Sequence, residues 1–329
     1  MPTKFWLPLV IVLFLFCLFL LSFSFSFKNP NMIYGVSFSP AQATYLGLDY
    51  KKVYTAILDD WNFKYIRLSV PWDGVEITKG NFDFSQLDWL MSEAGKRNAK
   101  IILAIGEKTP RWPECHTPDW AKNLSAEEYQ ADLQNYMTEV VNRYKGSPAL
   151  ETWQVENEPF VPFGVCQTLS KETLNAEVSL VKKIDSTHPI LTTDSGELGF
   201  WRTAAEAGDL FGTTMYRIVW NKYLGYLNYN SIFPPLFYRA KLWLAGRQPS
   251  DSYIIELQAE PWLPSNDPKT TPLAEQYTSM NLEKLKENIN FAENVGLSRV
   301  YLWGAEWWYW LREKGEMDIP NFIAQLKKQ

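Results

Sequence analysis

The sequence predicts a (β/α)8 TIM barrel that follows an N-terminal transmembrane or signal-anchor helix. Short apolar runs rich in β-branched residues alternate with longer amphipathic stretches, as expected for parallel strands covered by helices. Eight such alternations fit into roughly 300 residues, which is the size of a TIM barrel. A continuous apolar run near the N-terminus predicts the additional helix.

The first 28 residues are predicted to be a signal anchor or a signal peptide. Residues 5–21 are apolar throughout, follow Lys4, and approach the roughly 17–25 residues that span a bilayer. No small-residue cleavage pattern follows them, which favours an uncleaved anchor. We therefore expect residues 29–329 to form one extracytoplasmic domain, the predicted barrel, which is membrane-anchored, or secreted if the segment is cleaved.

The eight strands are predicted from runs that are too short and too apolar for surface helices. In chain order they are residues 32–37 (MIYGVS), 65–69 (YIRLS), 100–104 (KIILA), 150–155 (LETWQV), 190–193 (ILTT), 210–215 (LFGTTM), 253–256 (YIIE) and 299–303 (RVYLW). An open doubly wound sheet is the alternative. The first strand, however, continues into Gly-Val-Ser-Phe-Ser-Pro and not into a G-x-G-x-x-G phosphate turn.

The helices are predicted where apolar residues recur at helical spacing between these strands. They cover residues 50–61, 85–98, 126–144, 171–184, 235–244 and 278–295, with a short, less regular element at 200–207 after the fifth strand. Each predicted helix connects two parallel strands, so the carboxyl ends of all strands meet at one mouth of the barrel.

Charge and composition exclude several classes of function. The net charge is −5, and Lys and Arg are scattered, which disfavours binding to nucleic acid or to anionic lipid headgroups. The two histidines, His116 and His188, are too few for a His-rich metal cluster, and no G-x-S-x-G elbow is present. We expect no metal and no cofactor, and we expect carboxylates to carry out the chemistry. Fifteen tryptophans suit sugar binding, although core packing explains most of them.

Three cysteines occur, and Cys17 lies in the N-terminal apolar run. Cys115 and Cys166 are a candidate disulfide because an exported protein can retain one. On the chain-entropy model such a bridge stabilises the fold by about 4 kcal/mol. The alternative is two unrelated free thiols.

Three glutamates at predicted strand ends are candidate catalytic groups. Glu158 follows the fourth strand in Trp-Gln-Val-Glu-Asn-Glu-Pro, Glu256 ends the seventh strand, and Glu260 follows in Gln-Ala-Glu-Pro-Trp. A carboxylate near a strand end loses part of its hydration, and this costs free energy unless the group is paired with a cation or serves in catalysis. The alternative for Glu158 is a simple strand-to-loop turn.

The tripeptide Asn157-Glu158-Pro159, placed after a fourth barrel strand, resembles the Asn-Glu-Pro signature of the clan A glycoside hydrolases. The resemblance continues in residues 65–72 (YIRLSVPW), in Glu76 through residues 80–84 (GNFDF), and in residues 301–308 (YLWGAEWW). These passages are similar to cellulase-like and β-galactosidase-like members. The resemblance covers about 270 residues, from the first strand to the last.

The resemblance implies roles for individual residues. In the clan, the fourth-strand glutamate is the acid/base and a seventh-strand glutamate is the nucleophile, which implies Glu158 and Glu256, with Glu260 as the alternative nucleophile. The predicted substrate-binding residues are Arg67, Trp72, Asn157, Tyr216, Glu260 and Trp303. Arg67 is expected to keep Glu256 ionised, with a core ion pair as its alternative role, and the tryptophans have plain packing as theirs.

The sequence thus predicts a retaining β-glycosidase that hydrolyses O-glycosidic bonds of a β-linked glycan by double displacement. Its expected partners are a polysaccharide, oligosaccharide or glycoconjugate substrate, and the lipid bilayer through the N-terminal helix. We expect no nucleic-acid partner and a monomeric protein. A non-catalytic polysaccharide-binding barrel and a transglycosylase that uses the same glutamate pair are the alternatives.

Overall fold

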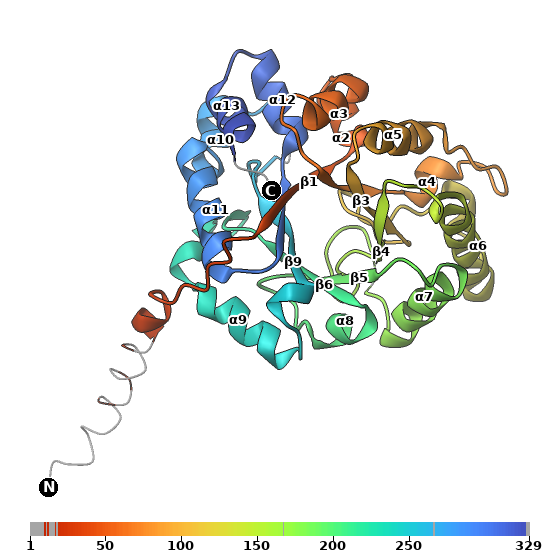
Figure 1. The fold of residues 1–329 in the computed structure, drawn as a ribbon, viewed down its shortest axis with the longest axis horizontal. Helices are drawn as coiled ribbons and strands as arrows, with labels where there is room; N and C mark the ends of the chain where they lie inside the picture. Colours follow the sequence, from red (N-terminus) through yellow and green to blue (C-terminus); the bar gives the residue numbers. More distant parts are fainter. Residues whose placement is uncertain are drawn as a thin grey trace, which may run out of the picture.

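A closed barrel of eight parallel strands forms the centre of the protein (Figure 1). The computed structural model describes residues 10, 12, 17, 19–166, 168–265 and 267–326. The barrel strands are β1 (Ile33–Phe38), β2 (Tyr65–Ser69), β3 (Lys100–Ile105), β4 (Leu150–Val155), β5 (Ile190–Asp194), β6 (Leu210–Met215), β9 (Ser252–Gln258) and β10 (Arg299–Trp303). The barrel closes because β1 pairs with both β2 and β10. The predicted barrel is confirmed.

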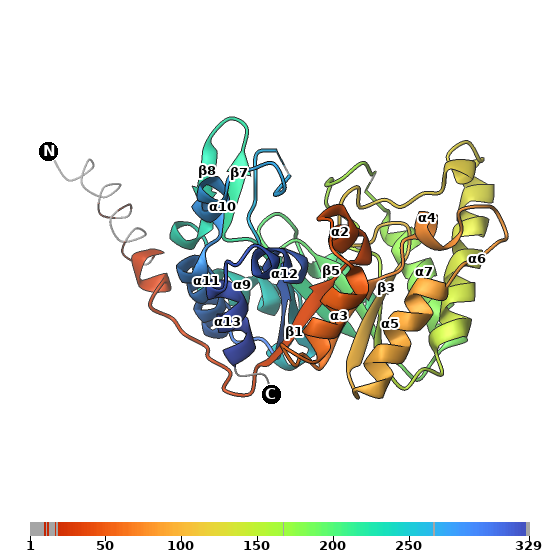
Figure 2. The same ribbon diagram turned by 90° about the horizontal axis from the view of Figure 1, so that it is seen from above.

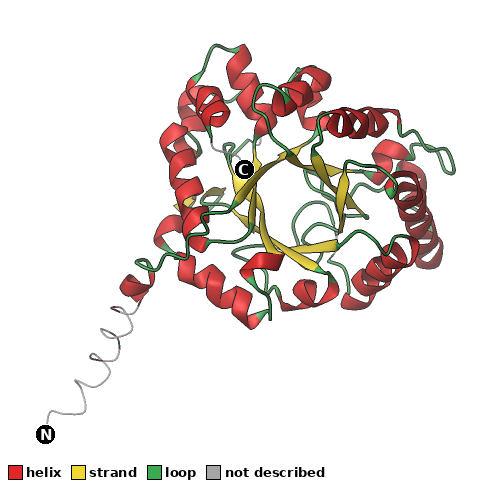
Figure 3. Cartoon of the chain, viewed as in Figure 1, coloured by secondary structure: helices red, strands yellow, loops and turns green. Residues whose placement is uncertain are grey.

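A ring of helices covers the outside of the barrel (Figure 3). The helices are α2 (Pro40–Tyr45), α3 (Tyr50–Leu58), α4 (Trp72–Val75), α5 (Ser85–Lys96), α6 (Ala126–Tyr144), α7 (Lys171–Ile184), α8 (Arg202–Ala207), α9 (Pro235–Leu244), α10 (Leu273–Ser279), α11 (Leu282–Val295), α12 (Ala305–Glu313) and α13 (Asp318–Gln325).

Capping residues explain where several helices begin and end. Ser125 and Glu128 form a reciprocal capping box at the start of α6, and Ser170 caps α7 through the backbone N–H of Thr173. Gly296 ends α11 in the left-handed conformation (φ 71°), where a Cβ atom would be strained. These local signals agree with the barrel topology, which fixes the strand ends and therefore the site.

The core has two parts. The larger part lies between the strands and the helices, and a smaller cluster lies within the barrel, formed by Ile102, Leu191, Tyr253, Ile255 and Tyr301. Gly35 of β1 allows the Tyr301 ring to fill the interior, since a Cβ atom there would lie only 2.6 Å from that ring. The barrel is thus packed with side chains, and any site must lie at its mouth.

Two irregularities shape the mouth. In β9, the pairing register with β6 shifts next to Glu256, and a bulge of this kind redirects side chains. After β6, the antiparallel hairpin β7 (Ile218–Asn221) and β8 (Gly225–Asn228) stands out from one end of the barrel (Figure 2). The side chain of Gln258 bonds the backbone of Arg217 and of Ile218, which fixes the base of the hairpin.

The structure departs from the prediction in a few places. The seventh barrel strand continues to Gln258, so Glu256 lies inside it and not at its end. The predicted helix at residues 278–295 is divided, because Ser279 ends α10 and the side chain of Asn281 caps the start of α11. The hairpin, α2, α4, α12 and α13 were not predicted.

The predicted N-terminal anchor lies largely outside the described residues. Within the part of the chain that the structure describes, no helix combines the length and the apolar character needed to cross a membrane.

Candidate active site

The residues that the sequence singles out converge at the carboxyl-terminal mouth of the barrel. Arg67 lies in β2, Asn157 and Glu158 directly follow β4, Tyr216 directly follows β6, and Glu256 lies in β9. These residues come from four different strands, β2, β4, β6 and β9, so only the closed barrel can bring them together.

Arg67 connects three strands across the mouth. Its guanidinium donates to Glu256 Oε1 at 2.6 Å, to Asn157 Oδ1 at 2.7 Å and to Gln154 Oε1 at 2.8 Å. Arg67 is only 1% exposed, so this ion pair is shielded from water. The arrangement supplies a positive charge and a fixed orientation to the Glu256 carboxylate.

Tyr216 holds the other oxygen of Glu256. Its hydroxyl donates to Glu256 Oε2 at 2.7 Å. Burial, followed by the charge of Glu256, raises the pKa of Tyr216 well above its usual value, so the hydroxyl keeps its proton. Both oxygens of Glu256 therefore accept bonds that stabilise the carboxylate form.

Glu158 has the opposite electrostatic environment. Its Oε1 accepts a hydrogen bond from the Thr214 hydroxyl at 2.9 Å, and its backbone N–H donates to the Thr193 hydroxyl at 2.9 Å. Burial raises the pKa of Glu158 to about 8, and the charges of Glu256 and Glu114 add to the effect. At neutral pH this carboxyl group is mainly protonated.

Thr214 relates the two carboxyl groups in space. Its hydroxyl binds Glu158, and its Cα is the register partner of Glu256 on the neighbouring strand. The charge of Glu256 also acts on the pKa of Glu158. A proton donor and a carboxylate thus occupy the same part of the mouth.

Glu114 is a third carboxyl group in the site, and it was not predicted from the sequence. Its Oε2 accepts from Asn157 Nδ2 at 3.0 Å. Burial, followed by the charge of Glu256, raises the pKa of Glu114 to about 7. Asn157 is therefore held at both ends of its amide, by Arg67 and by Glu114.

A buried turn supports Glu158 from below. The Glu156 carboxylate accepts from the backbone N–H groups of Glu107 and Lys108, both at 2.7 Å. Gly106 (φ 126°) makes room for it, because a Cβ atom there would lie 2.0 Å from Glu156 Oε1. The Lys108 ammonium then donates to the backbone carbonyls of Glu158, at 3.0 Å, and of Val161, at 2.8 Å. This network fixes the backbone that carries the proton donor.

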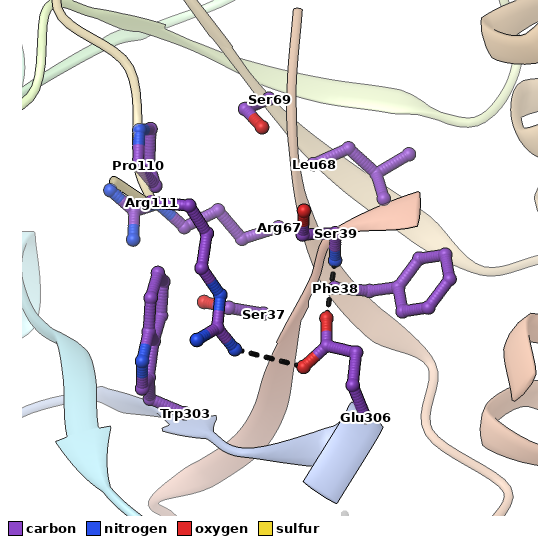
Figure 4. A pocket seen from close by; sticks show the side chains of 10 residues that line it. All are labelled: Ser37, Phe38, Ser39, Arg67, Leu68, Ser69, Pro110, Arg111, Trp303 and Glu306. Carbon is purple, nitrogen blue, oxygen red and sulfur yellow. Dashed lines mark hydrogen bonds and ion pairs between the residues drawn. The ribbon is translucent and has the colours of Figure 1, made fainter. Parts of the chain in front are cut away.

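Glu260 belongs to a different cluster. The Arg111 guanidinium donates to both oxygens of Glu260, at 2.5 and 3.1 Å, and to Glu306 Oε2 at 2.9 Å. Arg111 also lies 4.1 Å from the centre of the Trp303 ring, and Figure 4 shows it between Trp303 and Glu306. Burial acts to lower the pKa of Arg111, but the two carboxylates outweigh it and keep that pKa above its usual value.

Trp72 is not placed at the mouth. Its side chain is fully buried, its indole N–H donates to Glu76 Oε2 at 2.6 Å, and its ring packs against Trp120 and Tyr136. No face of this ring is open to a sugar, so its position matches packing and not substrate binding. Trp303 does lie at the mouth, beneath Arg111.

A disulfide and a row of aromatic rings lie along the loops above the site. Cys115 and Cys166 form the disulfide, with Cα atoms 5.5 Å apart, and it joins the loop after β3 to the loop after β4. The ring of Phe163 has the rings of Trp112 and Trp262 as neighbours, each at 6.3 Å. Loops that are distant in sequence therefore brace one another at the mouth.

A family model connects this geometry to known proteins. The model of Glycosyl hydrolase family 10 matches residues 36–177, which begin within β1 and include β2 to β4, Arg67, Glu114 and the Asn-Glu-Pro segment. This match, together with the closed parallel barrel, fits the clan A glycoside hydrolases. The family-10 match covers less than half of the chain, so it is a similarity of that part of the chain.

Curated relatives align over part of the length of this chain. Mannan endo-1,4-beta-mannosidase F of Aspergillus fumigatus is 28% identical over 143 residues, which are 40% of this chain and 32% of the relative. Beta-galactosidase BgaH of Haloferax lucentense is 25% identical over 125 residues, which are 32% of this chain and 18% of the relative. The chain therefore spans about a third or less of the relatives that it matches.

Solved structures share the barrel with this chain. Xylanase 10B from Thermotoga maritima superposes with a TM-score of 0.54 at 17% identity, covering 83% of each chain. A GH5_18 protein from Streptomyces cattleya, solved with GlcNAc, has a TM-score of 0.58 at 14% identity and covers 83% of this chain and 70% of its own. At these identities the likeness concerns the fold alone.

Proposed function

We propose that the protein is a retaining β-glycosidase that hydrolyses O-glycosidic bonds of a β-linked glycan, with Glu158 as acid/base and Glu256 as nucleophile. One observation carries the proposal. The mouth holds one carboxyl group with a pKa raised to about 8 and, beside it, a carboxylate paired with Arg67 at 2.6 Å. Double displacement needs this combination of a protonated acid and an ionised nucleophile.

In the first step, Glu256 attacks the anomeric carbon as a carboxylate while Glu158 gives its proton to the leaving glycosidic oxygen. The bond to that oxygen breaks, and an ester bond between sugar and Glu256 forms. Arg67 and Tyr216, which bond the two oxygens of Glu256, hold the attacking group in a fixed orientation.

In the second step, Glu158, now ionised, takes a proton from water, and the water oxygen displaces Glu256 from the anomeric carbon. The configuration of the sugar is retained because the carbon is attacked twice. Asn157, fixed between Arg67 and Glu114, is positioned to bond a sugar hydroxyl next to the reacting carbon.

Glu256 is favoured over Glu260 as the nucleophile by the partners of each. Glu260 shares a bidentate ion pair with Arg111, in a cluster that also contains Glu306. Glu256 lies beside Thr214, the residue that holds Glu158, and its charge is among the causes that raise the pKa of Glu158.

For the substrate we propose only a class, a β-linked glycan, and not a particular sugar. The names of the relatives refer to β-linked mannan and to β-galactosides, and a β-linked glycan is common to both. A screen of aryl β-glycosides and of glucan, mannan and galactan polymers would identify the sugar. We expect activity in the wild type and its loss in Glu158→Gln and in Glu256→Gln, with Glu127→Gln on the surface of α6 as a matched control.

Trapping distinguishes catalysis from simple glycan binding. A 2-fluoro glycoside of the preferred sugar should form a stable ester on Glu256, detected by mass spectrometry of the peptide that contains it. Labelling of Glu260 would show that Glu260, and not Glu256, is the nucleophile. A protein that binds the glycan but neither turns over nor becomes labelled would be a non-catalytic barrel.

We also propose that the barrel is held outside the cytoplasm by its N-terminal apolar segment. The run at residues 5–21 and the disulfide between Cys115 and Cys166, which suits an oxidising compartment, support this location. Fractionation of cells, followed by alkaline extraction of the membranes, should retain the intact chain and release a version that lacks residues 1–28.

A further inference from the structure

The loop after β3 extends across the mouth of the barrel. This loop, residues 107–116, carries Arg111, which bonds Glu260 beyond β9 and Glu306 in the first turn of α12. In the cyclic strand order, β3 and β9 stand four positions apart in either direction, so they face each other across the barrel. The Arg111 ion pairs therefore bridge opposite walls.

The bridging loop is well fixed. The backbone N–H of Thr109 donates to the carbonyl of Glu114, and that of Glu114 donates to the carbonyl of Arg111, at 2.9 and 2.8 Å. Its end is joined by the Cys115 disulfide to the loop after β4. Arg111 thus occupies a defined position and is not a freely moving surface side chain.

Beneath Arg111 the mouth is filled. The guanidinium covers one face of the Trp303 ring, and the space between them and the ends of β1 and β2 is a cavity of about 10 Å³ (Figure 4). That is about the room that one water molecule needs, and it is far smaller than a sugar ring. Its polar walls include Ser37, Ser39, Arg67, Arg111 and Glu306.

The proposed roles of Glu158 and Glu256 identify which side of the substrate meets the filled region around Arg111 and Trp303. Glu158 protonates the leaving oxygen, so the leaving part of the substrate extends on the Glu158 side, over β4. The part that becomes attached to Glu256 extends the other way, toward β10, which stands opposite β4 in the cyclic strand order, and its neighbour β1. Arg111 and Trp303 occupy that direction.

We propose that the enzyme acts at chain ends, releasing one sugar at a time from the non-reducing end, and that Arg111 determines this specificity by closing the cleft beyond a single sugar ring. The inference rests on the proposed function and adds to it the mode of cleavage. Glycans whose non-reducing end is substituted are excluded, whereas the leaving group is restricted much less.

The test uses labelled oligosaccharides of the sugar that the aryl glycoside screen identifies. A pentasaccharide labelled at its reducing end is compared with the same molecule carrying a 4,6-O-benzylidene acetal on its non-reducing sugar. We expect the wild type to shorten the free molecule by one sugar at a time and to leave the blocked one intact. Internal cleavage of the blocked molecule at a similar rate would overturn the inference.

Variants then test the role of Arg111. Replacing Arg111 with Ala removes the bridge, and the ratio of internal to terminal cleavage should rise by about tenfold or more. Arg143→Ala, which removes a surface ion pair with Asp88, should leave that ratio unchanged. An unchanged ratio in folded Arg111→Ala would show that Arg111 does not set the mode of cleavage.

The outcomes separate the two proposals. If aryl glycosides are hydrolysed and blocked chains are cut internally, only the inference about chain ends fails. If no glycoside or oligosaccharide is cleaved, or if activity survives in Glu158→Gln and Glu256→Gln, the proposed function fails and the inference fails with it. The comparison of free and blocked chains needs only the wild-type protein, so it remains decisive even if the Arg111 variant does not fold.

Discussion

Glu158→Gln tests the electrostatics of the site most directly. With its pKa at about 8, one unit above pH 7, Glu158 is protonated in about ten molecules for each ionised one. With the ordinary value of 4.5, which is 2.5 units below pH 7, only about one molecule in 300 would be protonated. The environment therefore increases the fraction of competent acid about 300-fold.

The predicted readout is the pH dependence of kcat/KM. Since the proton donor is lost as pH rises through the pKa of Glu158, activity toward phenyl glycosides should fall on an alkaline limb near pH 8. Gln cannot donate a proton, so Glu158→Gln should lower kcat/KM for phenyl glycosides by about 10²–10⁴-fold and remove the limb. A 2,4-dinitrophenyl leaving group needs no proton, so its kcat/KM should change little.

Azide provides an independent check of the same role. It attacks the sugar ester on Glu256 without a general base, so it should restore turnover in Glu158→Gln and give a β-glycosyl azide. An equal loss for every leaving group, or an alkaline limb that persists in the variant, would refute the assignment. Glu127→Gln, the same chemical change on a solvated helix, should behave as the wild type.

Stability gives a second measure of the same pKa. Because the pKa of Glu158 is higher in the folded state than its ordinary value of 4.5, folding favours the protonated form, and this cost of ionisation grows as pH rises toward about 8. Gln carries no charge at any pH. The Tm of Glu158→Gln relative to the wild type should therefore be higher at pH 8.5 than at pH 5.5, as measured by calorimetry.

Sequence reasoning succeeded where the barrel topology itself fixes the position of a residue. The alternation of apolar runs and helices predicts the order and direction of the strands, so Arg67 and Glu256 on strands and Glu158 after one could be assigned to the same mouth from the sequence alone. Their partners in the structure, such as Tyr216 on Glu256, come from neighbouring strands whose register the topology restricts.

The sequence could not predict the contacts that depend on the paths of loops. Arg111 lies 149 residues from Glu260 and 195 from Glu306 in the chain, and nothing local indicates that they meet. Glu114 precedes a cysteine, and that was the available signal, because the disulfide carries its loop to Asn157. Trp72 was misplaced for the opposite reason, since the short helix that it begins turns its ring into the core.

Three further changes test separate parts of the site. Arg67→Met leaves the Glu256 carboxylate buried without its cation, which costs about 3–5 kcal/mol, so both the Tm and kcat should fall and Arg67→Lys should recover part of each. Thr214→Val removes a hydrogen bond that lowers the pKa of Glu158, so the alkaline limb should move to higher pH, whereas Thr213→Val should leave it in place. Reduction of the disulfide removes a link between the two loops at the mouth, and its chain-entropy contribution to stability is about 4 kcal/mol at most. Because the barrel strands and their packing do not depend on that link, we expect a several-fold rise in KM with the far-UV spectrum retained. A double serine variant should reproduce the effect without reductant. If reduction instead lowers the Tm and the activity in parallel, with KM unchanged, the disulfide supports the fold as a whole and not the walls of the cleft.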